Sequence, residues 1–277
     1  MRTIGWVAVA AAAGWASSTA RAEDVKALLK RVEERMYYPQ AQGLKDLSAT
    51  VLFEGGGPGA PQMAVKVFWK APDKKACQVE LPPEVKESPM AAMIQGMMEK
   101  AVEGIVSVIV PVRLGAQEET YDYAAEADGD LTKITGTRKA GAKDTNAPEV
   151  MEMWVDAKAT PVKMGSVHKG QRTSLSNLKY VEKDGKLLIS EVQVEAAGGA
   201  AGKAQGAAMK LEYTQVDSIW LVQSAKVTGG QGGGGGYTVK DHAVNKGVDD
   251  AVFAPKPAPA GGMKLPAGMP PMGDDVK

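Results

Sequence analysis

The side chains that most often carry out catalysis or bind metals are rare in this chain. It has two histidines and one cysteine in 277 residues. His168 and His242 lie far apart, and neither begins a His-x-x-x-His spacing of metal ligands. Both lie in polar stretches typical of exposed positions, and no Gly-x-Ser-x-Gly motif marks a nucleophilic serine. We therefore expect a protein that is not an enzyme and holds no metal or cofactor. A Ser-His-Asp triad assembled in space would leave hydrolysis open.

The single cysteine, Cys77, has two interpretations. It lies beside Val79 and Leu81 in a strand-like run, which favours a buried and inert thiol. The alternative is an intermolecular partner. We expect burial, because the chain is long enough to be stabilised by its core without disulfides.

The N-terminus has the pattern of a secretory signal peptide. Arg2 precedes an apolar run over residues 4–13, and Ala20-Arg21-Ala22 is a small-x-small cleavage site. The run is too short to span a membrane. We expect cleavage after Ala22 and export to the periplasm. A net charge of zero gives no electrostatic footprint for nucleic acid or for an anionic membrane surface.

Two segments have helical periodicity. Residues 23–38 carry apolar side chains on one face and charged ones on the other, and Pro39 ends the pattern. Residues 89–104 form a second, methionine-rich helix, while residues 105–112 either extend it or begin a strand. Methionines suit surfaces that accept ligands of varied shape, but they also fill gaps in ordinary cores. Both interpretations stay open at this point.

The remaining chain has the alternation of an antiparallel sheet. Residues 47–53 and 63–69 predict a hairpin with a long turn, followed by a strand over residues 77–81. Short strands separated by tight turns then follow, at residues 121–127, 131–138, 150–155, 161–169, 172–181, 187–195, 208–216, 220–228 and 237–244. The glycine-rich stretches 196–207 and 229–236 predict flexible loops. Residues 254–277 have no periodicity and predict a disordered tail rich in Pro, Gly and Met, so the folded domain covers residues 23–253.

Four motifs at the ends of these strands resemble those of a known family. They are Val-Phe-Trp-Lys-Ala-Pro at 67–72, Met-Trp-Val-Asp-Ala-Lys at 153–158, Val-Asp-Ser-Ile-Trp-Leu at 216–221 and Asn-Lys-Gly-Val-Asp-Asp-Ala-Val-Phe at 245–253. The chain is thereby similar to LolA/LolB-type periplasmic lipoprotein carriers, more closely to their outer membrane lipoprotein-sorting branch. The resemblance implies an α+β fold, in which a large curled antiparallel sheet forms an incomplete β-barrel and helices cover its open concave face.

The resemblance also implies a function in transport. A curled sheet covered by apolar helices predicts an apolar cavity that takes up lipid or lipoprotein acyl chains. The candidate cavity-facing residues, from the hairpin and the methionine-rich helix, are Val51, Phe53, Val65, Val67, Trp69, Met93, Met97 and Met98. The alternative is an envelope sensor or protein-interaction module on the same scaffold, which an exposed apolar patch would favour.

Overall fold

The structure is a computed structural model that describes residues 22–54, 63–81, 83–88, 90–197, 205–229 and 235–254. Apart from Ala22 and Ala254, the predicted signal peptide and tail lie outside the described residues. The predicted cleavage site and domain boundaries therefore stay predictions.

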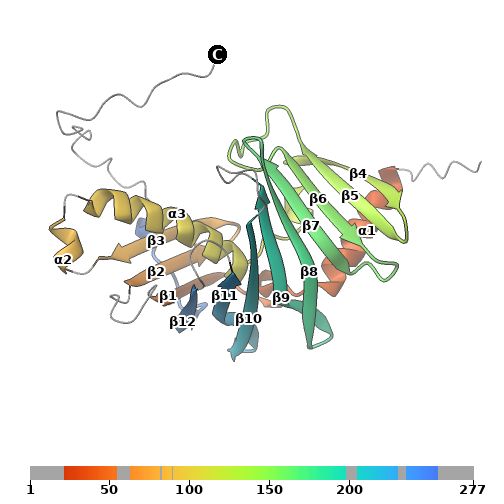
Figure 1. The fold of residues 1–277 in the computed structure, drawn as a ribbon. Helices are drawn as coiled ribbons and strands as arrows, with labels where there is room; N and C mark the ends of the chain where they lie inside the picture. The colour runs from red at the N-terminus through yellow and green to blue at the C-terminus, as the bar shows by residue number, and fades with distance from the viewer. Residues whose placement is uncertain are drawn as a thin grey trace, which may run out of the picture.

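The twelve strands in the described part of the chain belong to a single open sheet (Figure 1). Its order is β3-β2-β1-β12-β11-β10-β9-β8-β7-β6-β5-β4, so β3 and β4 are the edges. The strands are β1 Asp46–Glu54, β2 Met63–Lys70, β3 Lys74–Glu80, β4 Tyr121–Asp128, β5 Leu131–Arg138, β6 Val150–Val155, β7 Pro161–His168, β8 Gln171–Lys183, β9 Lys186–Ala197, β10 Gln205–Val216, β11 Ile219–Gly229 and β12 Gly235–Val244. The predicted curled antiparallel sheet is confirmed.

Local sequence explains most of the strand pairings. In the hairpin β1–β2, Val51 lies opposite Val65, and both are fully buried. Asp184 and Gly185 join β8 to β9, and both have positive φ angles, 50° and 73°. This conformation suits the two-residue turns of hairpins, in which Asp-Gly is a preferred pair.

One pairing joins distant parts of the chain. β12 pairs with β1, with Val244 opposite Leu47, and this contact makes the N-terminal hairpin and the later meander into one continuous sheet. Register shifts interrupt the pairings β1–β12, β6–β7, β8–β9 and β10–β11. Such bulges bend strands and increase their twist, which curls a large sheet.

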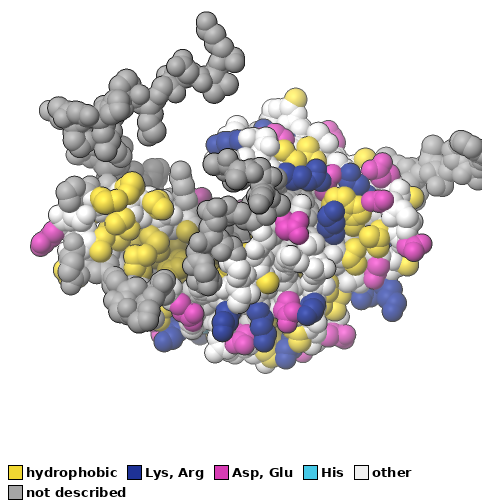
Figure 2. All heavy atoms as spheres, in the orientation of Figure 1, with side chains coloured by type: hydrophobic (Ala, Val, Ile, Leu, Met, Phe, Trp, Pro, Cys, Tyr) yellow, Lys and Arg dark blue, Asp and Glu magenta, His cyan; other side chains and the backbone are white. Residues whose placement is uncertain are grey.

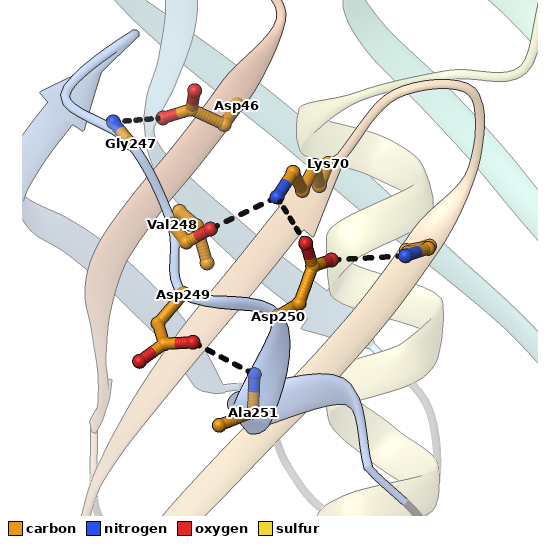
Figure 3. Close-up of polar contacts among 8 residues, drawn as sticks. Asp46, Lys70, Gly247, Val248, Asp249, Asp250 and Ala251 are labelled. Atoms are coloured by element: carbon orange, nitrogen blue, oxygen red, sulfur yellow. Dashed lines mark hydrogen bonds and ion pairs between the residues drawn. The ribbon is translucent and has the colours of Figure 1, made fainter.

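The segment after β12 fastens this junction (Figure 3). Asn245 accepts a hydrogen bond from the backbone N–H of Lys45, at 2.7 Å, and donates one to the carbonyl of Gly43. The carboxylate of Asp250 binds the ammonium groups of Lys70 and Lys74, each at 2.9 Å. These contacts hold the predicted closing motif against the N-terminal hairpin.

The first helix, α1, covers Ala22–Arg35 and is shorter than predicted. The prediction extended it to residue 38, but Met36 forms a bridge with Leu187 and Tyr37 donates its N–H to the Leu187 carbonyl at 3.0 Å. Pairing with β9 therefore replaces the last helical turn. Short helical segments follow at α2 Pro83–Lys86, η1 Pro39–Gln42, η2 Gly115–Gln117 and η3 Asp250–Phe253.

The methionine-rich helix, α3, covers Ala91–Ile109. Residues 105–109, which the sequence assigned to either helix or strand, continue the helix and bury Val106 and Ile109. No helix in the described part of the chain has both the length and the apolar character to cross a membrane.

The two long helices pack on different parts of the sheet (Figure 1). α3 contacts β2, β3 and β11, and α1 contacts β4 and β9. Two apolar clusters result. The α3 cluster includes Leu47, Val51, Val65, Trp69 and Leu221, and the α1 cluster includes Val25, Leu29, Val32, Ile134 and Val155.

Candidate functional site

An apolar hollow lies between the α1 and α3 clusters. Its volume is about 350 Å³. α1 contributes Leu29, Val32 and, just after the helix, Met36; the end of α3 contributes Val108 and Ile109. The strands that line it run from β4 to β11 and include Tyr123, Ile134, Met151, Met153, Met164, Leu175, Leu188, Val192, Met209, Leu211 and Tyr213. The sheet supplies the floor, and the helices supply the cover.

Periodicity explains how α1 forms its side of the hollow. Leu29 and Val32 are three residues apart, so they share one face of the helix, and Met36 follows directly after it. This is the apolar face that the sequence predicted. The segment after α3, with Pro111, Val112 and Leu114, completes the cover.

Methionines are prominent in the wall, but they come mainly from the sheet. The lining includes Met36, Met151, Met153, Met164 and Met209. Flexible, polarizable thioethers adapt to irregular shapes, which suits a variable apolar ligand. The sequence drew attention to the methionines of α3 because several lie close together there. Isolated methionines in strands gave no comparable signal.

The structure places the eight predicted cavity residues outside this lining. Val51, Val65, Val67 and Trp69 are buried in the α3 cluster, and Phe53 and Met98 pack against it at half-buried positions. Met93 and Met97 are 43% and 64% exposed. The predicted strand face is the one that α3 covers, yet the side chains there pack closely. Their contact with a ligand stays a prediction.

Polar groups on the walls are mostly satisfied within the protein. The Tyr213 hydroxyl donates to the Ile189 carbonyl at 2.7 Å. The Tyr37 hydroxyl accepts the N–H of Trp220 at 2.7 Å. The Tyr123 hydroxyl is buried with no hydrogen-bond partner among the described residues. Burial raises the pKa of Tyr123 and Tyr213, so both phenols stay neutral.

An ion pair joins the two parts of the cover. Glu33 of α1 binds the guanidinium of Arg113 and accepts the N–H of Gly115 at 2.9 Å. The Glu33 side chain is 15% exposed and that of Arg113 is 48% exposed. Their neighbours Val32 and Leu114 line the hollow, so the pair lies at its rim. Gln40 adds a second tie by donating to the Pro111 carbonyl at 2.9 Å.

Glu152 is a buried acid that the sequence analysis did not single out. Its carboxylate binds Lys133, at 2.9 Å, and Arg172. Met153 and Val155 of the same strand belong to the α1 cluster, so alternation directs the Glu152 side chain away from that cluster. Residue 152 is nevertheless part of the lining of the hollow. The hydrogen bond from Lys133 to Glu152 raises the pKa of that lysine. The two ion pairs give this buried carboxylate partners within the protein, which favours a structural role.

The histidines are half-buried, and the prediction of exposed positions was wrong. The His242 ring nitrogen Nε2 lies 3.2 Å from the Val222 carbonyl, and burial lowers the pKa of His242. Packing between strands partly buries both histidines, although each lies in a polar stretch of the sequence. Cys77 is also half-buried and packs against the α3 cluster. Within the described ranges, no group of three or more His, Cys, Asp or Glu side chains is arranged to hold a metal ion.

Comparison with solved structures gives matches over most of the chain. A DUF1329 family protein from Desulfovibrio piger is 14% identical, with 83% of this chain and 96% of that chain covered and a TM-score of 0.36. A LolA superfamily protein from Nitrosomonas europaea is 7% identical, covers 83% of this chain and 97% of its own, and gives a TM-score of 0.36.

A third structure is described as an outer membrane lipoprotein-sorting protein domain from Vibrio parahaemolyticus. It is 11% identical, with 84% of this chain and 97% of that chain covered and a TM-score of 0.37. No protein-family model matches the chain, and a comparison with curated proteins gives no match.

Proposed function

We propose that this protein is a non-enzymatic periplasmic carrier or binder of lipid or acylated protein. The observation that supports the proposal is the apolar hollow of about 350 Å³ between α1, the end of α3 and the sheet. This volume lies within the range of small-molecule sites, which are concave and mostly apolar. A hydrocarbon chain bound there would be buried among apolar side chains, and the flexible methionines of the wall can adapt to its shape.

Binding follows from the hydrophobic effect. Each methylene moved from water into the hollow contributes about 0.8 kcal/mol of favourable free energy to binding. Release needs no nucleotide when an acceptor binds the same acyl chain more tightly. The Glu33–Arg113 pair lies where the two parts of the cover meet, so loosening it would open a path to the hollow.

The direct test is native mass spectrometry of the full chain taken from the envelope fraction, combined with uptake of an environment-sensitive fatty-acid probe. We expect a bound lipid mass or saturable probe uptake. Met151→Trp fills the hollow and should reduce uptake, whereas Met90→Trp changes an exposed residue outside the lining and should not. Absence of both lipid mass and probe uptake would exclude a carrier.

A second candidate function is an envelope interaction module. Met90, Met93 and Met97 are exposed at and near the start of α3, and hydrophobic side chains gather on this part of the surface (Figure 2). Exposed apolar patches of this kind often mark protein interfaces. Site-specific cross-linking at position 97 tests this function: one discrete partner, lost in Met93→Glu, is expected if α3 is an interface.

A further inference from the structure

We propose that the hollow accepts a single acyl chain, so that the ligand is a one-chain amphiphile or a protein carrying one acyl group. This inference rests on the proposed function and specifies its substrate class. It follows from three properties: the volume of the hollow, the close packing of the two clusters beside it, and the hydrogen bonds between its wall segments.

The volume of the hollow limits the number of acyl chains that it can hold. About 350 Å³ is near the lower end of the range for small-molecule pockets, which reaches about 1,000 Å³. Ligands with two or three long chains need a correspondingly larger space. If only one of their chains is buried, the others remain in contact with water and their apolar surface gains nothing.

The two apolar clusters beside the hollow are closely packed. In the α1 cluster, Val155 has no exposed surface, and neither has Val32, which itself lines the hollow. In the α3 cluster, Leu221 and Val110 likewise have none. Protein interiors packed to this degree are nearly incompressible, so a second chain would have to displace core side chains.

Hydrogen bonds between the segments that line the hollow fix its width. Tyr213 joins β10 to β9 through the Ile189 carbonyl, and Tyr37 joins the segment after α1 to Trp220 of β11. Tyr180 joins β8 to β7 through the Pro161 carbonyl at 2.6 Å. Spreading these strands would break such bonds and leave buried polar groups unpaired, which costs about 1–3 kcal/mol for each group.

Only the side chains of the wall remain adaptable. The methionine side chains can change rotamer to follow a bent, branched or unsaturated chain. Their movement redistributes the existing space and does not double it. The hollow is therefore tolerant of chain shape and restrictive in chain number.

The test compares ligands by chain number, using delipidated full chain. Lysophosphatidylcholine, phosphatidylcholine and a synthetic triacylated lipopeptide are titrated as competitors of the fatty-acid probe, and stoichiometry is read by native mass spectrometry. We expect one lysolipid per protein, and at least tenfold weaker binding of the two- and three-chain ligands. Equal or tighter binding of these, or two lysolipids bound together, overturns the inference while leaving a carrier function intact. If none of the ligands binds, the proposed function itself fails.

Chain length provides an independent readout. Across a series of saturated fatty acids, affinity should rise about fourfold per methylene until the hollow is full, and then level off. Met164→Trp should move this plateau to shorter chains, because Met164 lines the hollow. Met90→Trp should leave it unchanged, because Met90 is exposed and outside the lining. Affinity that rises without a plateau in the unmodified protein contradicts a hollow of fixed capacity.

Discussion

Tyr123 carries an unpaired hydroxyl in the wall of the hollow. Its ring lies over Gly136, where an added Cβ would approach the ring to 2.8 Å. Leaving a buried polar group unpaired costs about 1–3 kcal/mol. Tyr123→Phe keeps the ring and removes the hydroxyl, so we expect the free energy of unfolding to rise by about 1 kcal/mol in urea denaturation.

Tyr213→Phe is the matched control at the residue scale. Its hydroxyl donates to Ile189, and its loss leaves that buried carbonyl without this partner. We expect the free energy of unfolding to fall by about 1 kcal/mol. If both tyrosine variants shifted stability in the same direction, hydrogen-bond satisfaction would not be what distinguishes the two phenols.

The ion pairs of Asp250 predict that the stability of the protein depends on pH. Lys70 and Lys74 hold its pKa at about 2, below the ordinary value of 3.8. Because the folded-state pKa is the lower one, the contribution to stability is complete above about pH 4. It is lost as the pH falls towards 2. Melting temperatures of wild type and Asp250→Asn should therefore differ at pH 5 and converge near pH 2; a constant difference would assign the effect to something other than titration.

At the scale of elements, the tie between α1 and the segment after α3 should control release. Glu33→Gln removes the charge that binds Arg113. We expect dissociation of the fatty-acid probe to become about tenfold faster in stopped-flow measurements, which corresponds to about 1.4 kcal/mol. Glu34→Gln is the control, because the Glu34 side chain is exposed and its ion pair is with Lys30, within α1. Equal acceleration in both variants would point to general fraying of the helix.

Periodicity predicted the elements well where local contacts decide them. The strand pairs around Asp-Gly turns and the amphipathic face of α1 follow from residues close in sequence. The end of α1 could not be predicted from residues close in sequence, because Met36 and Tyr37 pair with Leu187, about 150 residues away. The same limit applies to the histidines, whose burial depends on neighbouring strands.

At the scale of the whole molecule, the β1–β12 junction should make the two halves unfold together. Asn245 has a φ of 54° and bonds to both Lys45 and Gly43 across this junction. Asn245→Ala loses these bonds and strains the backbone, so we expect a loss of about 2 kcal/mol. Asn245→Gly relieves the strain and should lose less.

Trp69 and Trp154 report on the two halves, since they lie in β2 and β6. In two variants, either Trp69 or Trp154 is kept as the fluorescent reporter and the other tryptophans of the described residues are replaced. Both variants should give the same denaturation midpoint, and Asn245→Ala should lower both midpoints equally. Separate midpoints would show that the hairpin and the meander are independent units.

The sequence by itself determined the class of fold, the strands, the two long helices and the residues that share a face. These properties depend on alternation, helical spacing and turn residues, all of which act over a few positions. The position of the hollow was decided only by tertiary structure. Val51 and Trp69 had the expected alternation, but α3 packs closely over them, whereas curvature between β4 and β11 leaves space under α1. Whether two apolar surfaces meet or remain apart depends on bulges and on pairings between distant strands, and no local pattern encodes that distance.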